Sequence, residues 1–411
     1  MITLHLAALL VATSAAPPRP AFSWSTVPVF QHLASVNATP AAPFPPARLA
    51  WLAATFPVVV LEHAHGMGPW AYTAPPGGAA AWGPEPFTPP HTGFIEDVFA
   101  YTATAIKSLN STTTVLYYQQ ITGALPYYRA SAAAADHSLV LDPATCAPLG
   151  EARAAPAPAA GRLGDILPNY VSYAWDHLKP AVTANFVAAF ANMSARTALD
   201  GTFIDTASCY GAAGQADASI ATVAAMQAAA PNKLVGFHTE AALSGANGFS
   251  MAMDYTFAQP AKKGAPGKDT SCAAGLAWLD ANAAAGVLSF AHIGDVDQGP
   301  DMLFALACFL AGANNASYFA FSSANKAEAP WMECWDGGSP TAPVFPTWCS
   351  GQGWSADYAR PLGAPTGPRQ PTGGPRGEVA RAFASGTRVT VEARGAACSI
   401  AWADGHTTTC A

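Results

Sequence analysis

The strongest constraint on the fold is a repeated alternation between short apolar runs and alanine-rich helical stretches. From residue 21 onward, runs rich in Val, Ile, Leu and aromatic residues have the length of strands, and helical periodicity separates most of them. Continuous apolar strands that alternate with helices are typical of a parallel sheet covered on both faces. Eight such units over about 300 residues predict a (β/α)8 TIM barrel. The predicted strands are Val27–His32, Val58–Glu62, Thr114–Gln119, Gly201–Ile204, Lys233–Phe237, Ser250–Phe257, Val287–His292 and Ser317–Phe321.

An open, doubly wound α/β sheet is the alternative. It normally carries a Gly-rich phosphate loop directly after its first strand, and none follows Phe30. Since 51% of the residues are hydrophobic and only 11% are charged, the chain has enough apolar surface for a large core. We expect a barrel over residues 21–323 with an insert at 123–168, and a loop-rich segment at 324–411 that ends in a small β appendage. The strands expected there are Glu378–Phe383, Arg388–Glu392 and Ser399–Ala403.

Residues 1–16 predict a signal peptide and therefore a secreted protein. The apolar run Leu4–Val11 is followed by small residues at Ser14–Ala16, and it is too short to span a bilayer. A buried N-terminal helix is the other interpretation. The net charge of −7, without any basic run, argues against nucleic acid as a partner. Leu303–Ala313, the next most apolar run, has the length of a core helix, so we expect no stable membrane insertion.

The cysteines and the glycosylation sequons both fit an oxidising compartment. Eight cysteines occur without any Cys-x-x-Cys pair, which argues against a zinc site of the finger type. Closeness in sequence predicts the disulfides Cys334–Cys349 and Cys398–Cys410, Cys209–Cys272 would join two barrel loops, and Cys308 is expected to be a buried free thiol. Asn-x-Ser/Thr sequons are found at Asn37, Asn110, Asn192 and Asn315.

Polar residues gather where the predicted strands end, which is where the chemistry of TIM barrels is found. Asp205 closes the fourth strand, as a glycosidase nucleophile would, and Glu240 and Asp254 follow on the next two strands as candidates for the acid. The other interpretation of Asp205 is that it caps the following loop or helix. Further candidates for contacts with a carbohydrate substrate are Glu62, His63, Tyr118, Gln119, Asp200, His238, His292 and Trp331.

Several short motifs carry a resemblance to a known group of proteins. They are Asp-Gly-x-Phe-x-Asp at 200–205, Trp175-Asp176 before a helix, the fifth strand that runs into His238-Thr239-Glu240, the sixth strand around Asp254, and Pro361-Leu362-Gly363-x-Pro365 followed by Arg381-x-Phe383-x-x-Gly386. In these the chain resembles the glycoside-hydrolase-like (β/α)8-barrel families that are distantly similar to the α-galactosidase and endo-α-1,4-polygalactosaminidase groups. The resemblance implies a nucleophile at Asp205 and an acid/base on the fifth or sixth strand. Because position 254 is Asp rather than Glu, both Glu240 and Asp254 stay open.

Two other classes of function fit the same residues. His63-Ala64-His65, with His238 and His292 on later strands, could hold zinc in an amidohydrolase-like barrel. In that family, however, the His-x-His pair would follow the first strand, and the eighth strand here lacks its Asp. A carbohydrate-binding protein without catalysis is the third class, in which the carboxylates bind sugar hydroxyls. The carboxylate interpretation predicts no metal and no cofactor.

Overall fold

The computed structural model describes most of the barrel and the C-terminal sheet. The residues it describes are 19–35, 38–63, 65–66, 94–125, 127–143, 145–148, 173–196, 198–206, 209–238, 247–252, 257, 271–296, 300–323 and 355–410. Among these residues, no helix is both long and apolar enough to cross a membrane.

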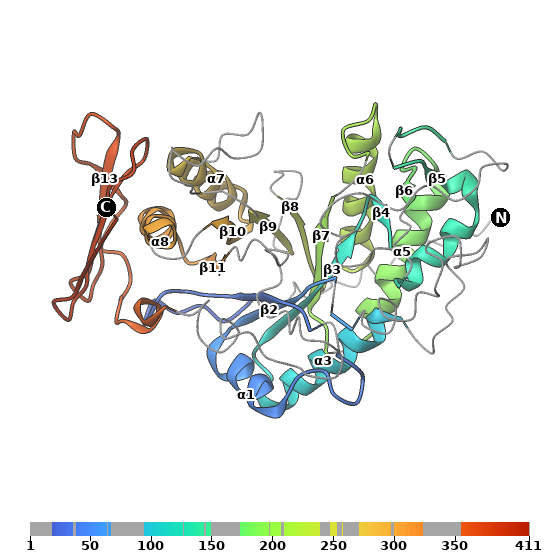
Figure 1. The fold of residues 1–411 in the computed structure, drawn as a ribbon, viewed down its shortest axis with the longest axis horizontal. Coiled ribbons are helices and arrows are strands. Elements are labelled where there is room, and N and C mark those ends of the chain that lie inside the picture. Colours follow the sequence, from blue (N-terminus) through green and yellow to red (C-terminus); the bar gives the residue numbers. More distant parts are fainter. Residues whose placement is uncertain are drawn as a thin grey trace, which may run out of the picture.

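Eight parallel strands form the predicted barrel (Figure 1), in the order β1-β2-β3-β7-β8-β9-β10-β11. The ring closes where a parallel bridge pairs Val29 with Phe319. There, Phe30 N–H donates to the Phe319 carbonyl at 3.0 Å, and Phe319 N–H donates to the Pro28 carbonyl at 2.8 Å. The strands are β1 (Gln31–Leu33), β2 (Val58–Leu61), β3 (Thr114–Gln120), β7 (Gly201–Asp205), β8 (Leu234–His238), β9 (Gly248–Ala252), β10 (Leu288–Val296) and β11 (Ser317–Ser323).

The helices between the strands begin and end at residues suited to those positions. Proline stands at the start of α1 and α5, where the missing N–H costs no hydrogen bond. The Ser271 side chain accepts a hydrogen bond at the start of α7, and Gly286 ends that helix with a left-handed φ of 68°. The helices are α1 (Pro46–Thr55), α3 (Ile95–Leu109), α5 (Pro180–Ser194), α6 (Gln215–Ala229), α7 (Cys272–Ala285) and α8 (Pro300–Gly312).

Aromatic rings from separate strands fill the barrel interior. Phe290 lies between Phe30 and Phe249, with ring centroids 5.1 and 4.9 Å away, and Phe249 contacts Phe203 at 6.4 Å. All four rings are buried. Gly236 leaves space for one of them, because a Cβ at this position would lie 1.8 Å from the Phe249 ring. The lumen is therefore closed by packed rings, and polar groups find room only toward the strand ends.

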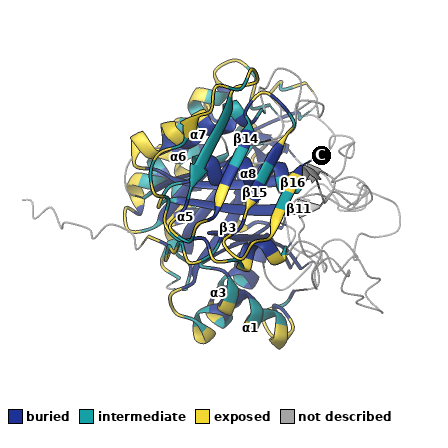
Figure 2. Ribbon diagram, turned by 90° about the vertical axis from the view of Figure 1, so that its left-hand side faces the viewer, coloured by how far each residue is buried: buried dark blue, intermediate teal, exposed yellow. Residues whose placement is uncertain are grey.

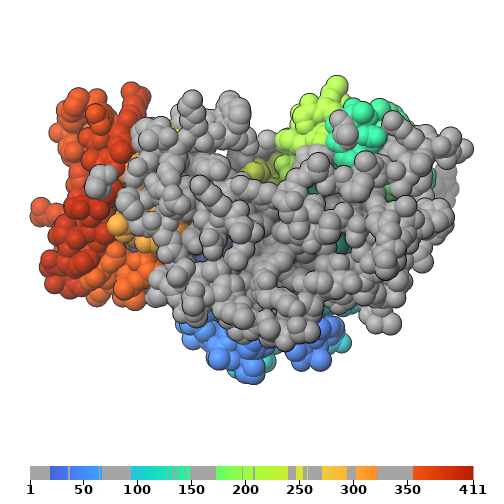
Figure 3. Space-filling model, viewed as in Figure 1, coloured from blue at the N-terminus to red at the C-terminus, as the bar shows by residue number. Residues whose placement is uncertain are grey.

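The insert forms a small sheet of its own, beyond the C-terminal ends of β3 and β7. Strands β4 (Gly123–Ala124), β6 (Tyr173–Trp175) and β5 (Val140–Leu141) pair in that order, next to the 3₁₀ helices η2 (Arg129–Ala135) and η3 (His137–Leu139). In Figure 3 the described part of the insert adjoins the segment that follows β7. The Cys146–Cys209 disulfide joins these two regions covalently.

The C-terminal appendage is larger than the predicted three strands. It is an antiparallel sheet of five, in the order β12-β13-β14-β15-β16, and it packs on α8 (Figure 2). Trp24, from the N-terminal segment, contacts Phe383 of this part at 5.9 Å between ring centroids. The strands are β12 (Gln370–Pro371), β13 (Glu378–Ala382), β14 (Arg388–Glu392), β15 (Cys398–Ala401) and β16 (Thr407–Cys410).

The disulfides confirm one sequence prediction and correct two. Cys398–Cys410 forms as predicted, across the neighbouring strands β15 and β16. The pairing Cys209–Cys272 was wrong, because Cys209 bonds to Cys146 of the insert. The prediction of a free thiol at Cys308 was also wrong, because packing of α8 on α7 brings it to Cys272, with Cα atoms 5.8 Å apart. Cys334 and Cys349 lie outside the described residues.

The close approach of β7 to β8 predicts a strict requirement for glycine at position 201. A Cβ at Gly201 would lie 2.0 Å from the Leu234 carbonyl oxygen, which is backbone and cannot rotate away. We expect Gly201→Ala to lower the free energy of unfolding by about 1–3 kcal/mol or more, as overpacked sites do, measured by denaturant unfolding with the disulfides intact. Gly211→Ala is the matched control, since a Cβ there meets nothing within 4 Å. Equal stability of the two variants would contradict the prediction.

Candidate functional site

Two carboxyl groups stand at the C-terminal ends of strands on either side of β3. Glu62 directly follows β2, and Asp205 is the last residue of β7. Leu61 of β2 pairs with Tyr117 of β3, and Tyr118 of β3 pairs with Phe203 of β7. Tyr118 therefore lies between the strand that leads to Glu62 and the strand that ends at Asp205. Sequence analysis assigned Glu62 only to substrate contact. The structure places it beside the Asp205 network.

Asp205 is held by groups from three sides. Its carboxylate accepts a hydrogen bond from the Tyr118 hydroxyl at 2.8 Å and another from the Thr206 N–H at 2.7 Å. His238, at the end of β8, places Nδ1 3.3 Å from the same carboxylate. Gln120 donates to the Tyr118 hydroxyl at 3.0 Å and so extends the network by one residue. The Asp205 side chain keeps 18% of its surface exposed, which leaves an approach for a substrate.

Burial raises the pKa of the Tyr118 hydroxyl well above its usual value, and the negative charge of Asp205 adds to this effect. The phenol therefore stays protonated and acts as a hydrogen-bond donor. Its hydrogen bond fixes the rotation of the Asp205 side chain, and because the phenol is neutral it adds no second negative charge beside Asp205.

Glu62 lies in a different environment, with 1% of its surface exposed. Burial raises the pKa of its carboxyl group, the neighbouring His63 opposes this shift, and the charge of Asp205 reinforces it. His63 Nδ1 lies 2.5 Å from the Glu62 carboxyl group. The His63 ring in turn packs on Tyr118, with centroids 4.9 Å apart. Through His63 and Tyr118, the two acids therefore belong to one contiguous cluster.

Two further imidazoles lie deeper in the lumen. His32 of β1 and His292 of β10 approach with their Nδ1 atoms 3.4 Å apart. Burial lowers the pKa of His32 well below its usual value, and the nearby His292 and His63 lower it further. Nε2 of His32 and Nε2 of His238 are buried and have no hydrogen-bond partner in the part of the chain that the structure describes. Buried polar atoms of this kind usually bind a ligand or water.

His65 does not join His63, although the two are separated by a single residue. The chain turns after Glu62, with His65 N–H donating to the Glu62 carbonyl at 2.9 Å. Nδ1 of His65 accepts from Ser35 N–H at 3.0 Å, and Nε2 bonds the Thr102 hydroxyl of α3 at 2.8 Å. Both ring nitrogens are thus engaged by the protein, so the proposed His63/His65 zinc pair is not arranged as a pair of ligands. The described residues contain no group of three or more potential ligands that could hold a metal ion.

The other predicted site residues divide into three groups. Asp200 lies at the opposite end of β7, where it accepts from Val115 N–H at 2.7 Å and pairs with Lys107 at 2.6 Å. Gln119 points away from the face of β3 that carries Tyr118, because side chains alternate along a strand. The remaining three, Glu240, Asp254 and Trp331, lie outside the described residues.

Gln120 was missed by sequence analysis because the predicted third strand ended one residue too early. The strand runs to Gln120, which therefore lies on the same face as Tyr118. The apolar pattern stops at Tyr118, so only the alternation of side chains could have pointed to Gln120.

No protein-family model and no curated protein matches the sequence. Among solved structures, a variant of the glycoside hydrolase domain of PelA from Pseudomonas aeruginosa is 19% identical, with a TM-score of 0.40 over 74% of this chain and 98% of that one. An α-amylase from Malbranchea cinnamomea is 10% identical, with a TM-score of 0.42 over 90% and 86% of the two chains. A family 20 β-N-acetylglucosaminidase is 12% identical, with a TM-score of 0.39, and the match spans 69% of this chain and 56% of that one.

The buried environment of His65 predicts sensitivity of the fold to acid. Burial lowers the pKa of His65 to about 3, whereas a histidine in the unfolded chain titrates near 6.5. The unfolded chain then binds a proton that the native protein does not, so the stability that His65 contributes is present above pH 6.5 and is lost as the pH falls toward 3.

His65→Gln keeps one donor and one acceptor but does not titrate. We expect the stability lost between pH 7 and pH 4.5 to be smaller in this variant by about 2–3 kcal/mol, measured by urea unfolding at both pH values. His406→Gln, on the exposed end of the C-terminal sheet, is the control. An acid-induced loss in His65→Gln as large as in the wild type would refute this assignment.

Proposed function

We propose that this protein is a secreted glycoside hydrolase that cleaves O-glycosidic bonds of a polysaccharide or glycoconjugate through two carboxyl groups. One observation carries the proposal: Glu62 and Asp205 share one cluster but have different surroundings. Glu62 is buried, which raises its pKa, whereas Asp205 is partly exposed and accepts hydrogen bonds from Tyr118 and Thr206. Glycoside hydrolysis needs one carboxyl group that is protonated and one that is ionised.

In this mechanism Glu62 is the proton donor. Its raised pKa keeps a proton available for the leaving oxygen as the glycosidic bond breaks. His63 contacts its carboxyl group at 2.5 Å and holds it in place. Proton transfer to the leaving group avoids the expulsion of a free alkoxide, which is the most demanding part of this reaction.

Asp205 acts on the other side of the same bond. Its carboxylate stabilises the positive charge that develops on the sugar, either by attacking the anomeric carbon or by activating a water molecule. The Tyr118 hydroxyl and the Thr206 N–H fix its orientation, so little rearrangement is needed during the reaction. His238 contacts the same carboxylate and adds to its orientation, and its buried Nε2 has no hydrogen-bond partner among the described residues.

Glu240 and Asp254 remain alternative donors on the fifth and sixth strands. The resemblance of the sequence to glycoside-hydrolase-like barrels supports them, whereas the environment of Glu62 supports that residue. Secretion is part of the proposal. The apolar start of the sequence and the three disulfides support it, since disulfides persist in oxidising compartments.

Substitution of the carboxyl groups tests the proposal. We would screen the secreted protein against aryl α- and β-glycosides and polysaccharides, with and without EDTA. Turnover should survive EDTA, and Asp205→Asn and Glu62→Gln should each lower kcat by about 10²–10⁴-fold or more. Asp217→Asn, an exposed acid in the first turn of α6, is the matched control and should retain full activity.

The outcomes separate the alternatives. If Glu62→Gln stays active while Glu240→Gln or Asp254→Asn is inactive, the donor is one of those residues and not Glu62. Loss of activity in EDTA would favour the metal-dependent class instead. Saturable binding of a polysaccharide without turnover by the wild type would favour a carbohydrate-binding protein.

The pH profile gives a second test of Glu62. Activity should fall as the pH rises through the raised pKa of Glu62, because the donor loses its proton. His63 opposes that rise, so His63→Gln should move the alkaline limb of kcat to higher pH. The profile is measured on the best aryl glycoside found in the screen. An alkaline limb that stays in place, or moves to lower pH, would show that His63 does not set the proton affinity of the acid.

A further inference from the structure

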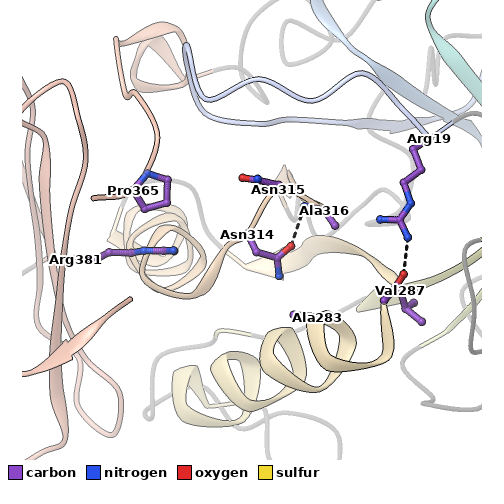
Figure 4. Close-up of a pocket in the computed structure, with 9 residues that line it drawn as sticks. Arg19, Ala283, Val287, Asn314, Asn315, Ala316, Pro365 and Arg381 are labelled. Carbon is purple, nitrogen blue, oxygen red and sulfur yellow. Dashed lines mark hydrogen bonds between the residues drawn. The ribbon is translucent and has the colours of Figure 1, made fainter. Parts of the chain in front are cut away.

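A polar pocket lies at the opposite end of the barrel from the carboxyl groups. It has a volume of about 410 Å³ and forms where the segments that lead into β10 and β11 meet the N-terminal segment and the C-terminal sheet (Figure 4). Its charged residues, Arg19 and Arg381, approach from these last two parts of the chain. Asn314 and Asn315, between α8 and β11, supply its amide groups, and none of the described residues that line it is acidic.

The hydrogen-bonding groups that the polar side chains leave free in this pocket are mainly donors. The Asn315 side-chain oxygen accepts from Trp24 Nε1 at 2.6 Å, and the Asn314 oxygen accepts from Ala316 N–H at 2.8 Å. Because both of these partners can only donate, the two oxygens are fixed and both NH₂ groups are left without a protein partner in the described part of the chain. A ligand that binds to these amide groups therefore acts as an acceptor.

Arg381 adds a cation that has no carboxylate partner in the part of the chain that the structure describes. Its Nη1 donates to three carbonyls near the end of α8, the shortest at 2.5 Å from Ala313, and Nε donates to Gly367 at 3.3 Å. Nη2 has no protein partner among the described residues. Burial lowers the pKa of Arg381 to about 10, and the nearby Arg369 lowers it further. Asp280, the nearest acid, is already in a bidentate pair with Arg369.

Arg19 provides the second charge. Within the described ranges its side chain donates one hydrogen bond, from Nη2 to the Gly286 carbonyl at 2.6 Å, at the end of α7. The C-terminal ends of α7 and α8 each contribute about half a negative charge, so about one positive charge remains from the two guanidinium groups. That balance suits a monoanion better than a dianion such as phosphate.

We propose that this pocket binds a monoanionic oxyanion, namely the carboxylate group of a small molecule or of an acidic sugar. The carboxylate would accept hydrogen bonds from a free Arg19 nitrogen and from the asparagine amides, and Arg381, which lies on the other side of these amides (Figure 4), would attract it through its positive charge. Hydrogen bonds between a guanidinium group and a carboxylate are charge-assisted, and they are stronger than hydrogen bonds between neutral groups. The site does not depend on the proposed hydrolase activity.

The test is binding of acetate and of glucuronate to the full chain, prepared without N-glycans because Asn315 begins a sequon. Isothermal titration calorimetry, with sodium chloride keeping the ionic strength constant, should give saturable binding of acetate, and glucose should not bind this pocket. Arg19→Gln should weaken acetate binding about tenfold or more, as loss of one charge-assisted contact does. Arg388→Gln, an exposed arginine on the adjacent strand, should bind as the wild type does.

Arg381→Gln should also weaken binding, but Arg381 holds the α8 carbonyls, so its loss can unfold the protein. Arg19 is exposed and makes one hydrogen bond, so Arg19→Gln keeps the test decisive. Tighter binding of glucuronate than of acetate would identify an acidic sugar as the molecule that carries the bound carboxylate. Equal affinity would identify a small free carboxylate instead. If acetate gives no saturable heat, or if Arg19→Gln binds it as well as the wild type, the proposal is overturned.

Discussion

The hydrogen bonds between the first and last strands hold the arrangement together. Phe30 and Phe319 complete the ring of parallel strands, and all eight strands then point in one direction. Because the strands are parallel, their carboxyl ends meet at one rim, where residues that are far apart in sequence come together. Glu62 and Asp205 are neighbours of Tyr118 because β3 pairs with β2 on one side and with β7 on the other. The common direction of the strands also places Asp200 and the arginine pocket at the other end of the barrel.

Packing decides how the two acids differ. Four phenylalanine rings fill the lumen below them, so polar groups are forced into a thin layer at the strand ends. Within that layer Glu62 is enclosed and Asp205 stays partly open, although both are carboxylic acids. The chemical difference between them comes from desolvation and hydrogen-bond partners, not from residue type. A buried tyrosine makes this arrangement stable, since its hydroxyl remains a donor and keeps Asp205 oriented.

The insert and the C-terminal sheet contact different parts of the barrel. The insert is tied by the Cys146–Cys209 disulfide to the segment after β7, directly beyond Asp205. The C-terminal sheet instead covers α8, and Arg381 carries its positive charge to the carbonyls at the end of that helix. The short tail motif containing Arg381 therefore has a physical role, namely to satisfy the end of a helix and to line a pocket of hydrogen-bond donors. Neither role is visible without the packing.

The sequence by itself determined the order of strands and helices, because apolar periodicity is a local signal. It also located Asp205, Tyr118 and His238 at strand ends, and it predicted the Cys398–Cys410 bridge, whose cysteines are close in the chain. Only the tertiary structure could pair Cys146 with Cys209 and Cys272 with Cys308, since those contacts depend on which loops and helices pack together. It also separated His65 from His63 and Asp200 from Asp205, and it gave Glu62 its buried environment. Burial and partner choice are properties of distant segments brought together, and no local pattern along the chain encodes them.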